Sequence, residues 1–113
     1  MENMVRILNA EEFNTKIENG SGVAVVDFFA TWCGPCKMLA PVFQQACDEM
    51  GSRANFVKVD IDQSMELARK YSVSTVPTVM VFKDGKPVET IVGFMPKENL
   101  ISKVSAHIDG EHI

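Results

Sequence analysis

The chain has 113 residues, of which 46% are hydrophobic, and a formal net charge of −4 at pH 7. This length fits one compact domain over residues 1–113, and the hydrophobic fraction is high enough for a core, which argues against intrinsic disorder. The mild acidic balance argues against a protein that binds nucleic acid or anionic membrane surfaces, because both usually carry a basic excess.

The first predicted elements are a short strand and a helix. The strand covers Val5 to Leu8. Asn9 is placed to cap the helix, with Glu12 three residues on as the second half of a capping box. The helix runs to about Asn19 and stops at the Gly-Ser-Gly breaker of residues 20–22.

The next segment, Val23 to Ala30, is apolar except for Asp27. It shows no polar alternation, which is typical of a central strand covered on both faces. A long helix follows the Cys-Gly-Pro-Cys stretch, since its apolar positions fall on one face. Gly51 can end this helix, and Pro41 inside it predicts a kink.

The rest of the chain predicts two more helices around a hairpin. Asn55 to Asp62 has the pattern of a strand, with Asp62 as the cap of a short helix over Met65 to Tyr71. Val76 to Phe82 and Val88 to Val92 are predicted to pair around a turn at residues 83–86. Pro96 begins a last helix with an apolar stripe at Leu100, Ile101, Val104 and Ile108.

This order of elements indicates the α/β class. Strands and helices alternate first, and an antiparallel hairpin then closes the sheet. We therefore expect one central mixed five-stranded sheet flanked by four helices, with helices on both faces.

Two cysteines, Cys33 and Cys36, stand where the predicted central strand ends and a helix begins. Reactive groups in α/β folds lie at the carboxyl ends of strands, and the free N–H groups of a first helical turn favour a thiolate. We expect Cys33, at the outer end, to be the more exposed and to have a lowered thiol pKa. Gly34 lets a partner backbone approach, and Pro35 suits a first helical turn because it needs no N–H there.

A zinc site is the main alternative for these cysteines. A structural zinc ion usually takes four nitrogen or sulfur ligands, and only Cys47, His107 and His112 remain as candidates. Cys47 falls on the core face of its helix, and both histidines are predicted to be solvated. The ligand count therefore favours redox chemistry over a metal site. For Cys47, a small core side chain is favoured over a regulatory thiol.

The stretch WCGPC from Trp32 to Cys36, after VVDFFAT and before KMLAP, resembles the thioredoxin family. The resemblance covers nearly the whole chain and includes FVKVDID, STVPTVMVFKDG and VGF at the expected later positions. It implies the thioredoxin fold and dithiol–disulfide exchange: Cys33 attacks a substrate disulfide, and Cys36 then resolves the mixed disulfide.

The resemblance also implies partners. The substrates would be proteins that contain disulfides. The electron donor would be a thioredoxin reductase, either an NADPH-dependent flavoprotein or a ferredoxin-linked enzyme. We expect a monomer that needs no cofactor of its own.

Asp27, Lys58 and Pro77 receive roles from the same resemblance. The apolar neighbours of Asp27 indicate burial, which raises a carboxyl pKa by desolvation, and the matching family residue is a buried proton carrier beneath the resolving cysteine. Lys58 would be its partner. A structural aspartate and a solvated lysine are the alternatives. Pro77 is implied to be cis, although most X–Pro bonds are trans.

The family's docking surface would form around the cysteines. The backbone of Val76 would pair with an extended substrate as an added strand does. The surrounding apolar surface would comprise Trp32, Gly34, Pro35, Thr75, Val76, Val92 and Gly93. One departure from the family is Phe29, at a position where bacterial thioredoxins often have tryptophan; we expect it to alter local packing and not the chemistry.

Two other functions stay open at this point. A disulfide oxidase or isomerase usually has Pro-His or Gly-His between its cysteines, so the Gly34-Pro35 spacer and the lack of a signal-peptide pattern disfavour it. A binding module that uses the fold to hold a partner is compatible with an intact WCGPC. The sequence has no apolar run long enough to span a bilayer, and we expect the cytoplasm, where thiols stay reduced.

Overall fold

The computed structural model describes residues 4–108 of the chain. Within this range it contains the predicted alternation of strands and helices, so the expected element order is confirmed. The elements are β1 (Arg6–Ile7), α1 (Ala10–Phe13), a π-helical continuation (Asn14–Glu18), β2 (Val23–Phe29), α2 (Gly34–Met50), a 3-10 turn (Gly51–Arg53), β3 (Asn55–Asp60), α3 (Met65–Lys70), β4 (Thr78–Lys83), β5 (Lys86–Val92) and α4 (Lys97–Ser105).

The five strands form one mixed sheet in the order β1-β3-β2-β4-β5. The pairs β1–β3 and β3–β2 are parallel, whereas β2–β4 and β4–β5 are antiparallel. β2 is the central strand, and all seven of its residues are buried. This confirms the central strand predicted from the apolar run around Asp27 and the mixed sheet predicted from the order of the elements.

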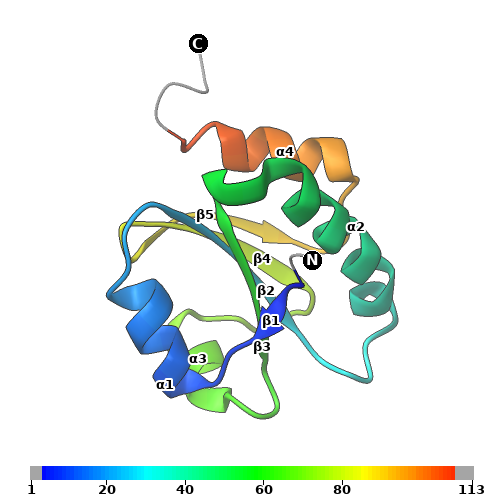
Figure 1. The fold of residues 1–113 in the computed structure, drawn as a ribbon. Helices are drawn as coiled ribbons and strands as arrows, with labels where there is room; N and C mark the ends of the chain where they lie inside the picture. Colours follow the sequence, from blue (N-terminus) through cyan, green and yellow to red (C-terminus); the bar gives the residue numbers. More distant parts are fainter. Residues whose placement is uncertain (1–3, 109–113) are drawn as a thin grey trace.

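Helices cover both faces of the sheet (Figure 1). On one face, Phe43 of α2 and Leu100 of α4 pack with Val25 of β2. On the other face, Phe13 of α1 and Leu67 of α3 belong to a second core cluster, together with several strand residues. Because side chains alternate along a strand, Asp27 lies on the same face as Val25, which is the face covered by α2.

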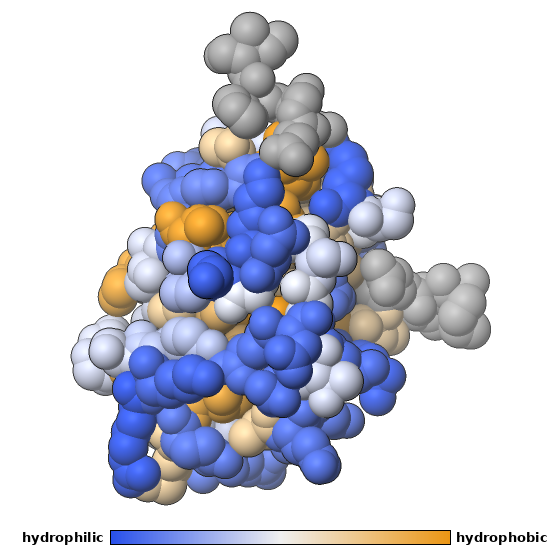
Figure 2. Space-filling model, turned by 90° about the vertical axis from the view of Figure 1, so that its left-hand side faces the viewer, coloured by the Kyte–Doolittle hydropathy of each residue, from blue (hydrophilic) through white to orange (hydrophobic). Residues whose placement is uncertain are grey.

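The surface over α1 is mostly hydrophilic. Figure 2 views the molecule from the side that carries α1 in Figure 1, and hydrophobic residues show there only as small separate patches. The apolar residues Phe13 and Ile17 of this segment are turned inward and are almost fully buried. The small hydrophobic patches that remain visible on this side are normal for a folded domain.

The start of the first helix follows the predicted capping box. The side chain of Asn9 accepts the N–H of Glu12 at 2.8 Å, and the Glu12 carboxylate accepts the N–H of Asn9 at 2.9 Å. These two bonds satisfy donors that a helix start otherwise leaves open. The helix then continues as a π-helical segment to Glu18.

The predicted helix cap at Asp62 is wrong. β3 ends at Asp60, whose side chain accepts the N–H of Asp62 and whose carbonyl accepts the N–H of Ser64. This turn delays the helix, so that Ser64 is the cap residue of α3. The Asp62 carboxylate instead accepts a hydrogen bond from the indole N–H of Trp32 at 2.8 Å.

The hairpin turns at Asp84 and Gly85, whose φ angles are 50° and 86°. Two successive positive φ values are the geometry that joins antiparallel strands with a two-residue loop. β5 begins at Lys86, earlier than predicted, and therefore includes Pro87. A proline is tolerated there because β5 is an edge strand and the register shifts at that point.

Candidate active site

Cys33 and Cys36 form a disulfide at the start of α2, with their Cα atoms 5.2 Å apart. Cys33 is the N-cap residue, with extended backbone, and Cys36 lies in the first turn. The N–H of Cys36 donates to the Cys33 sulfur at 3.1 Å. Gly34 and Pro35 occupy the first two helical positions, where a missing proline N–H costs nothing.

The electrostatic setting of Cys33 favours a thiolate. α2 is 17 residues long and has no acidic residue in its first turn. The partial positive charge of a helix N-terminus stabilises an anion at this place, and the N–H of Cys36 already points at the sulfur. In the reduced protein, the same groups would stabilise negative charge on Cys33.

The expected difference in exposure between the two cysteines is not observed. Cys33 is 5% exposed and Cys36 is 4% exposed. Val76 and Ile61 pack over them, and the Cys33 sulfur lies 3.7 Å from the carbonyl oxygen of Val76. Cys33 would be exposed if only its place at the start of α2 mattered. The loop before β4 packs over Cys33 and buries it.

That loop contains a cis peptide bond between Val76 and Pro77. Two hydrogen bonds hold it against the neighbouring strands: the N–H of Gly93 donates to the Pro77 carbonyl at 2.8 Å, and the Thr78 hydroxyl donates to the Thr75 carbonyl at 2.6 Å. The backbone of Val76 is thereby fixed beside Cys33.

The residues predicted to form the docking surface come from three segments. Gly34, Pro35 and Thr75 are exposed, and Val76 and Gly93 are half-buried. The largest exposed apolar side chains among them are those of Trp32 (68% exposed) and Val92 (62% exposed). The Cys33–Val76 contact and the Gly93–Pro77 hydrogen bond join these segments.

Asp27 is fully buried, and neither of its carboxylate oxygens has a hydrogen-bond partner among the described residues. Desolvation raises its pKa from 3.8 to about 6, although the positive charge of Lys58 works in the opposite direction. Lys58 is the register neighbour of Asp27 on β3. Its ammonium group lies 4.4 Å from the centre of the Phe29 ring, a cation–π contact.

A small hollow of about 210 Å³ has both Lys58 and the resolving cysteine, Cys36, in its lining. Lys58 and Phe29 line one part of it, and Cys36 and Ala40 of α2 line another. A water molecule occupies about 30 Å³ in the liquid, so the hollow has room for proton carriers between Cys36 and solvent.

Two contacts were not predicted from the sequence. Trp32 and Asp62 are 30 positions apart, and no motif connects them. His107 was expected to be solvated, which is wrong: it is half-buried, and its Nε2 lies 2.7 Å from a carboxylate oxygen of Glu89 on β5. α4 packs toward β5 and brings the two side chains together. His112 lies outside the described residues.

Cys47 is buried at 3% exposure in the core cluster beneath α2, and burial raises the pKa of its thiol. This agrees with the predicted core side chain. Among residues 4–108, no group of three or more histidine, cysteine or acidic side chains is arranged to hold a metal ion. None of the described helices is both long and apolar enough to cross a membrane.

Comparison with known proteins gives one consistent result. The family model described as thioredoxin matches residues 4–106. A thioredoxin of Staphylococcus epidermidis is 50% identical over 97 residues, which cover 86% of this chain and 91% of that protein. A thioredoxin of Staphylococcus aureus is 47% identical over 105 residues, which cover 93% and 98%.

Solved structures agree with the sequence comparison. The thioredoxin of Malassezia sympodialis superposes with a TM-score of 0.84 at 34% identity, over 94% of this chain and 92% of that one. A thioredoxin variant of Halobacterium salinarum gives a TM-score of 0.83 at 31% identity, over 93% and 90%.

Proposed function

Because this chain belongs to the thioredoxin family, we propose that it acts as a general reductant of protein disulfides, with Cys33 as nucleophile and Cys36 as resolving thiol. Its activity is that of a protein-disulfide oxidoreductase, and the disulfide-linked pair at the start of α2 is the redox-active centre. This pair is the observation on which the function depends.

In the first step, the thiolate of Cys33 attacks one sulfur of a substrate disulfide. A bond forms between Cys33 and that sulfur, and the second substrate sulfur leaves as a thiolate that takes up a proton. The N-terminal position on α2 supports this role of Cys33, because it favours the charged form of the sulfur.

In the second step, Cys36 loses its proton and attacks Cys33. The intramolecular disulfide forms, and the substrate leaves with both of its cysteines reduced. We assign Asp27 as the group that accepts the Cys36 proton, directly or through the hollow that Lys58 and Cys36 share. A pKa of about 6 suits a base that works near neutral pH.

Substrate binding is assigned to the surface around the disulfide. Val76, beside the cis-Pro77 bond, would pair its backbone with an extended substrate segment. Trp32, Gly34, Pro35, Thr75, Val92 and Gly93 would contact the substrate's flanking residues. The exposed indole is oriented by its hydrogen bond to Asp62, which lowers the cost of ordering it on binding.

The oxidised pair must be reduced again by a second protein. We assign this step to a thioredoxin reductase, either an NADPH-dependent flavoprotein or a ferredoxin-linked enzyme. The protein would act as a monomer in the cytoplasm, where reducing systems keep protein thiols in the dithiol state.

The experiment is a coupled reduction assay. The oxidised protein is supplied with NADPH and a flavoprotein reductase, or with reduced ferredoxin and its reductase, and with insulin as the disulfide substrate. We expect catalytic reduction of insulin with one of the two donors. A variant with both Cys33→Ser and Cys36→Ser is the control and should be inactive.

Two outcomes would contradict the proposal. Failure with both donors, although dithiothreitol reduces the pair, would exclude a reductase-linked role. Faster oxidation of reduced substrates than reduction of oxidised ones, in a glutathione buffer of cytosolic composition, would instead indicate a disulfide oxidase.

A further inference from the structure

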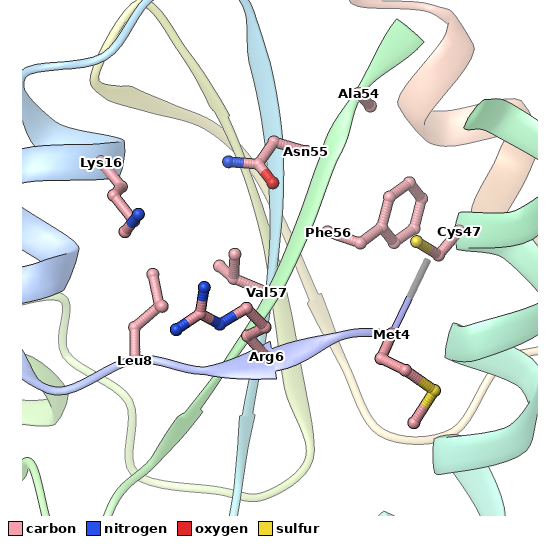
Figure 3. A pocket seen from close by; sticks show the side chains of 9 residues that line it. All are labelled: Met4, Arg6, Leu8, Lys16, Cys47, Ala54, Asn55, Phe56 and Val57. Carbon is pink, nitrogen blue, oxygen red and sulfur yellow. The ribbon is translucent and has the colours of Figure 1, made fainter. Parts of the chain in front are cut away.

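A hollow of about 390 Å³ opens at the edge of the sheet, far from the disulfide (Figure 3). It surrounds the start of β3 at Asn55, whereas the cysteines lie beyond the other end of that strand. Six strand residues separate the two ends by roughly 17–20 Å. The hollow is thus a separate feature of the molecule.

Two cations line it, and neither has a partner in the described part of the chain. Arg6 of β1 and Lys16 of the π-helical segment are exposed, and neither side chain forms an ion pair or a hydrogen bond with any residue in the range 4–108. Other lysines of the described chain do have carboxylate partners, such as Lys70 with Glu18 and Lys103 with Glu89. Within residues 4–108 no acidic residue lines the hollow, so the charge of its described lining is positive although the whole chain is acidic.

The polar groups of the hollow converge on its α1 side. In Figure 3, the Lys16 ammonium and the Arg6 guanidinium extend into the same space, and the amide of Asn55 points in from β3. Leu8 and Val57, both buried, form the floor beneath them. Cationic and amide donors around one space match an oxyanion, and arginine binds carboxylate and phosphate oxygens through two parallel N–H groups.

The hollow continues past the sheet edge to an apolar side. β1 pairs with β3 only at Val57 and Lys58, so Phe56 lies beyond the end of that ladder. Phe56 and the exposed Met4 line this part of the hollow, on the side toward α2. A bare phosphate would leave most of the volume empty, whereas the volume lies within the range of small-molecule sites, about 300–1,000 Å³.

We propose that this hollow binds a small organic anion, with its phosphoryl or carboxylate head between Arg6 and Lys16 and its apolar body against Met4 and Phe56. The site lies outside the redox centre, and its occupation does not depend on the thiol chemistry proposed above.

Amide chemical shifts of the full-length, ¹⁵N-labelled, oxidised protein test the proposal. Phenyl phosphate is the probe, with inorganic phosphate and phenol as its two halves. We expect saturable shifts at Arg6, Asn55 and Phe56 with phenyl phosphate at millimolar concentration, weaker ones with inorganic phosphate, and none with phenol. Added salt should weaken the binding because the cations are exposed.

The double variant Arg6→Gln, Lys16→Gln should bind phenyl phosphate at least about tenfold more weakly, since it loses the charge-assisted hydrogen bonds. Lys86→Gln removes an exposed lysine of β5 and is the matched control; it should bind like the parent protein. Both variants should reduce insulin at the parent rate.

Absence of saturable shifts with phenyl phosphate, or unchanged binding by the double variant, would overturn the proposal. Equal affinity for phenyl phosphate and inorganic phosphate would overturn the role given to Met4 and Phe56. Saturable shifts with an acidic peptide and none with phenyl phosphate would assign the hollow to a protein partner instead.

Discussion

The position of Asp27 in the core costs the fold free energy. A carboxyl group with no hydrogen-bond partner in the described part of the chain sits in the central strand at 0% exposure. Its pKa rises from 3.8 to about 6 because burial disfavours the charged form. Between these pH values, the folded protein keeps a proton that the unfolded chain has lost.

This difference fixes how stability changes with pH. Below about pH 3.8, Asp27 is protonated in both states and its ionisation costs nothing. As the pH rises from 3.8 to about 6, the Asp27 carboxyl lowers the free energy of unfolding. Above about pH 6, its contribution no longer changes with pH. At about 1.4 kcal/mol per pH unit, the full cost is about 3 kcal/mol.

Asp27→Ala should therefore raise the free energy of unfolding of the oxidised protein at pH 8 by about 1–3 kcal/mol, after a small loss from the cavity that alanine leaves. The gain should shrink as the pH approaches 4. Guanidinium titrations across this pH range measure it, with Glu66→Ala as the control because that carboxylate is exposed.

The same variant should resolve mixed disulfides more slowly at neutral pH, because Cys36 loses its proton acceptor. Stopped-flow exchange measures this rate. A variant that is less stable at pH 8 and equally fast would make Asp27 a structural residue only.

Lys58 sets how far the pKa of Asp27 rises. Its charge lowers that pKa and so opposes the effect of burial. In Lys58→Met, the pKa of Asp27 should rise above about 6, and the ¹³C chemical shift of the Asp27 carboxyl follows this titration directly. An unchanged or lower pKa in the variant would remove Lys58 as its electrostatic partner.

At the scale of elements, the hairpin between β4 and β5 depends on glycine. Gly85 has a φ of 86°, and a Cβ added there would collide with the backbone carbonyl of Glu18. Gly22 has a similar φ of 79°, but open space surrounds it. A substitution at Gly22 therefore tests backbone strain alone, whereas one at Gly85 tests strain together with a steric collision.

Gly85→Ala should lower the free energy of unfolding by more than Gly22→Ala does, since both pay a strain cost of about 1 kcal/mol or more and only the first adds a collision. Urea titrations of both variants measure the difference. An equal decrease in the free energy of unfolding of both variants would show that the segment around Glu18 moves away at no cost.

The elements that the sequence predicted well carry strong local signals. The capping box at Asn9, the apolar run of β2 around Asp27 and the Asp84-Gly85 turn each follow from neighbouring residues. The error at Asp62 came from the turn after β3, which uses a backbone hydrogen bond to Asp60 that no residue pattern announces. Local signals therefore placed the elements, including the start of α3 at Met65, but missed its cap residue, Ser64.

At the scale of the whole molecule, contacts between distant segments were the hardest to predict. The positions of Cys33 and Cys36 at a strand–helix junction were predictable, and so was the burial of Asp27. The cover that Val76 gives Cys33 was not, because it depends on how a loop 43 positions later packs. The pairing of His107 with Glu89 likewise requires α4 to lie beside β5.

The apolar surface around the disulfide should matter for reactions with protein partners and not for reactions with small thiols. Replacing Trp32 or Val76 by glutamate should slow reduction of insulin and transfer from the reductase by about tenfold or more, because a charge would enter an apolar contact. Reduction of the pair by dithiothreitol should stay nearly unchanged. Equal losses with both kinds of reductant would mean that the substitutions damage the redox centre itself.

The central claim is the division of roles between Cys33 and Cys36, and covalent trapping tests it most directly. Each single serine variant is reduced, mixed with oxidised insulin and analysed on a non-reducing gel. Cys36→Ser should accumulate a mixed disulfide through Cys33, because no thiol remains to resolve it. Cys33→Ser should trap almost none. Equal trapping by the two variants, or trapping by Cys33→Ser alone, would contradict the account.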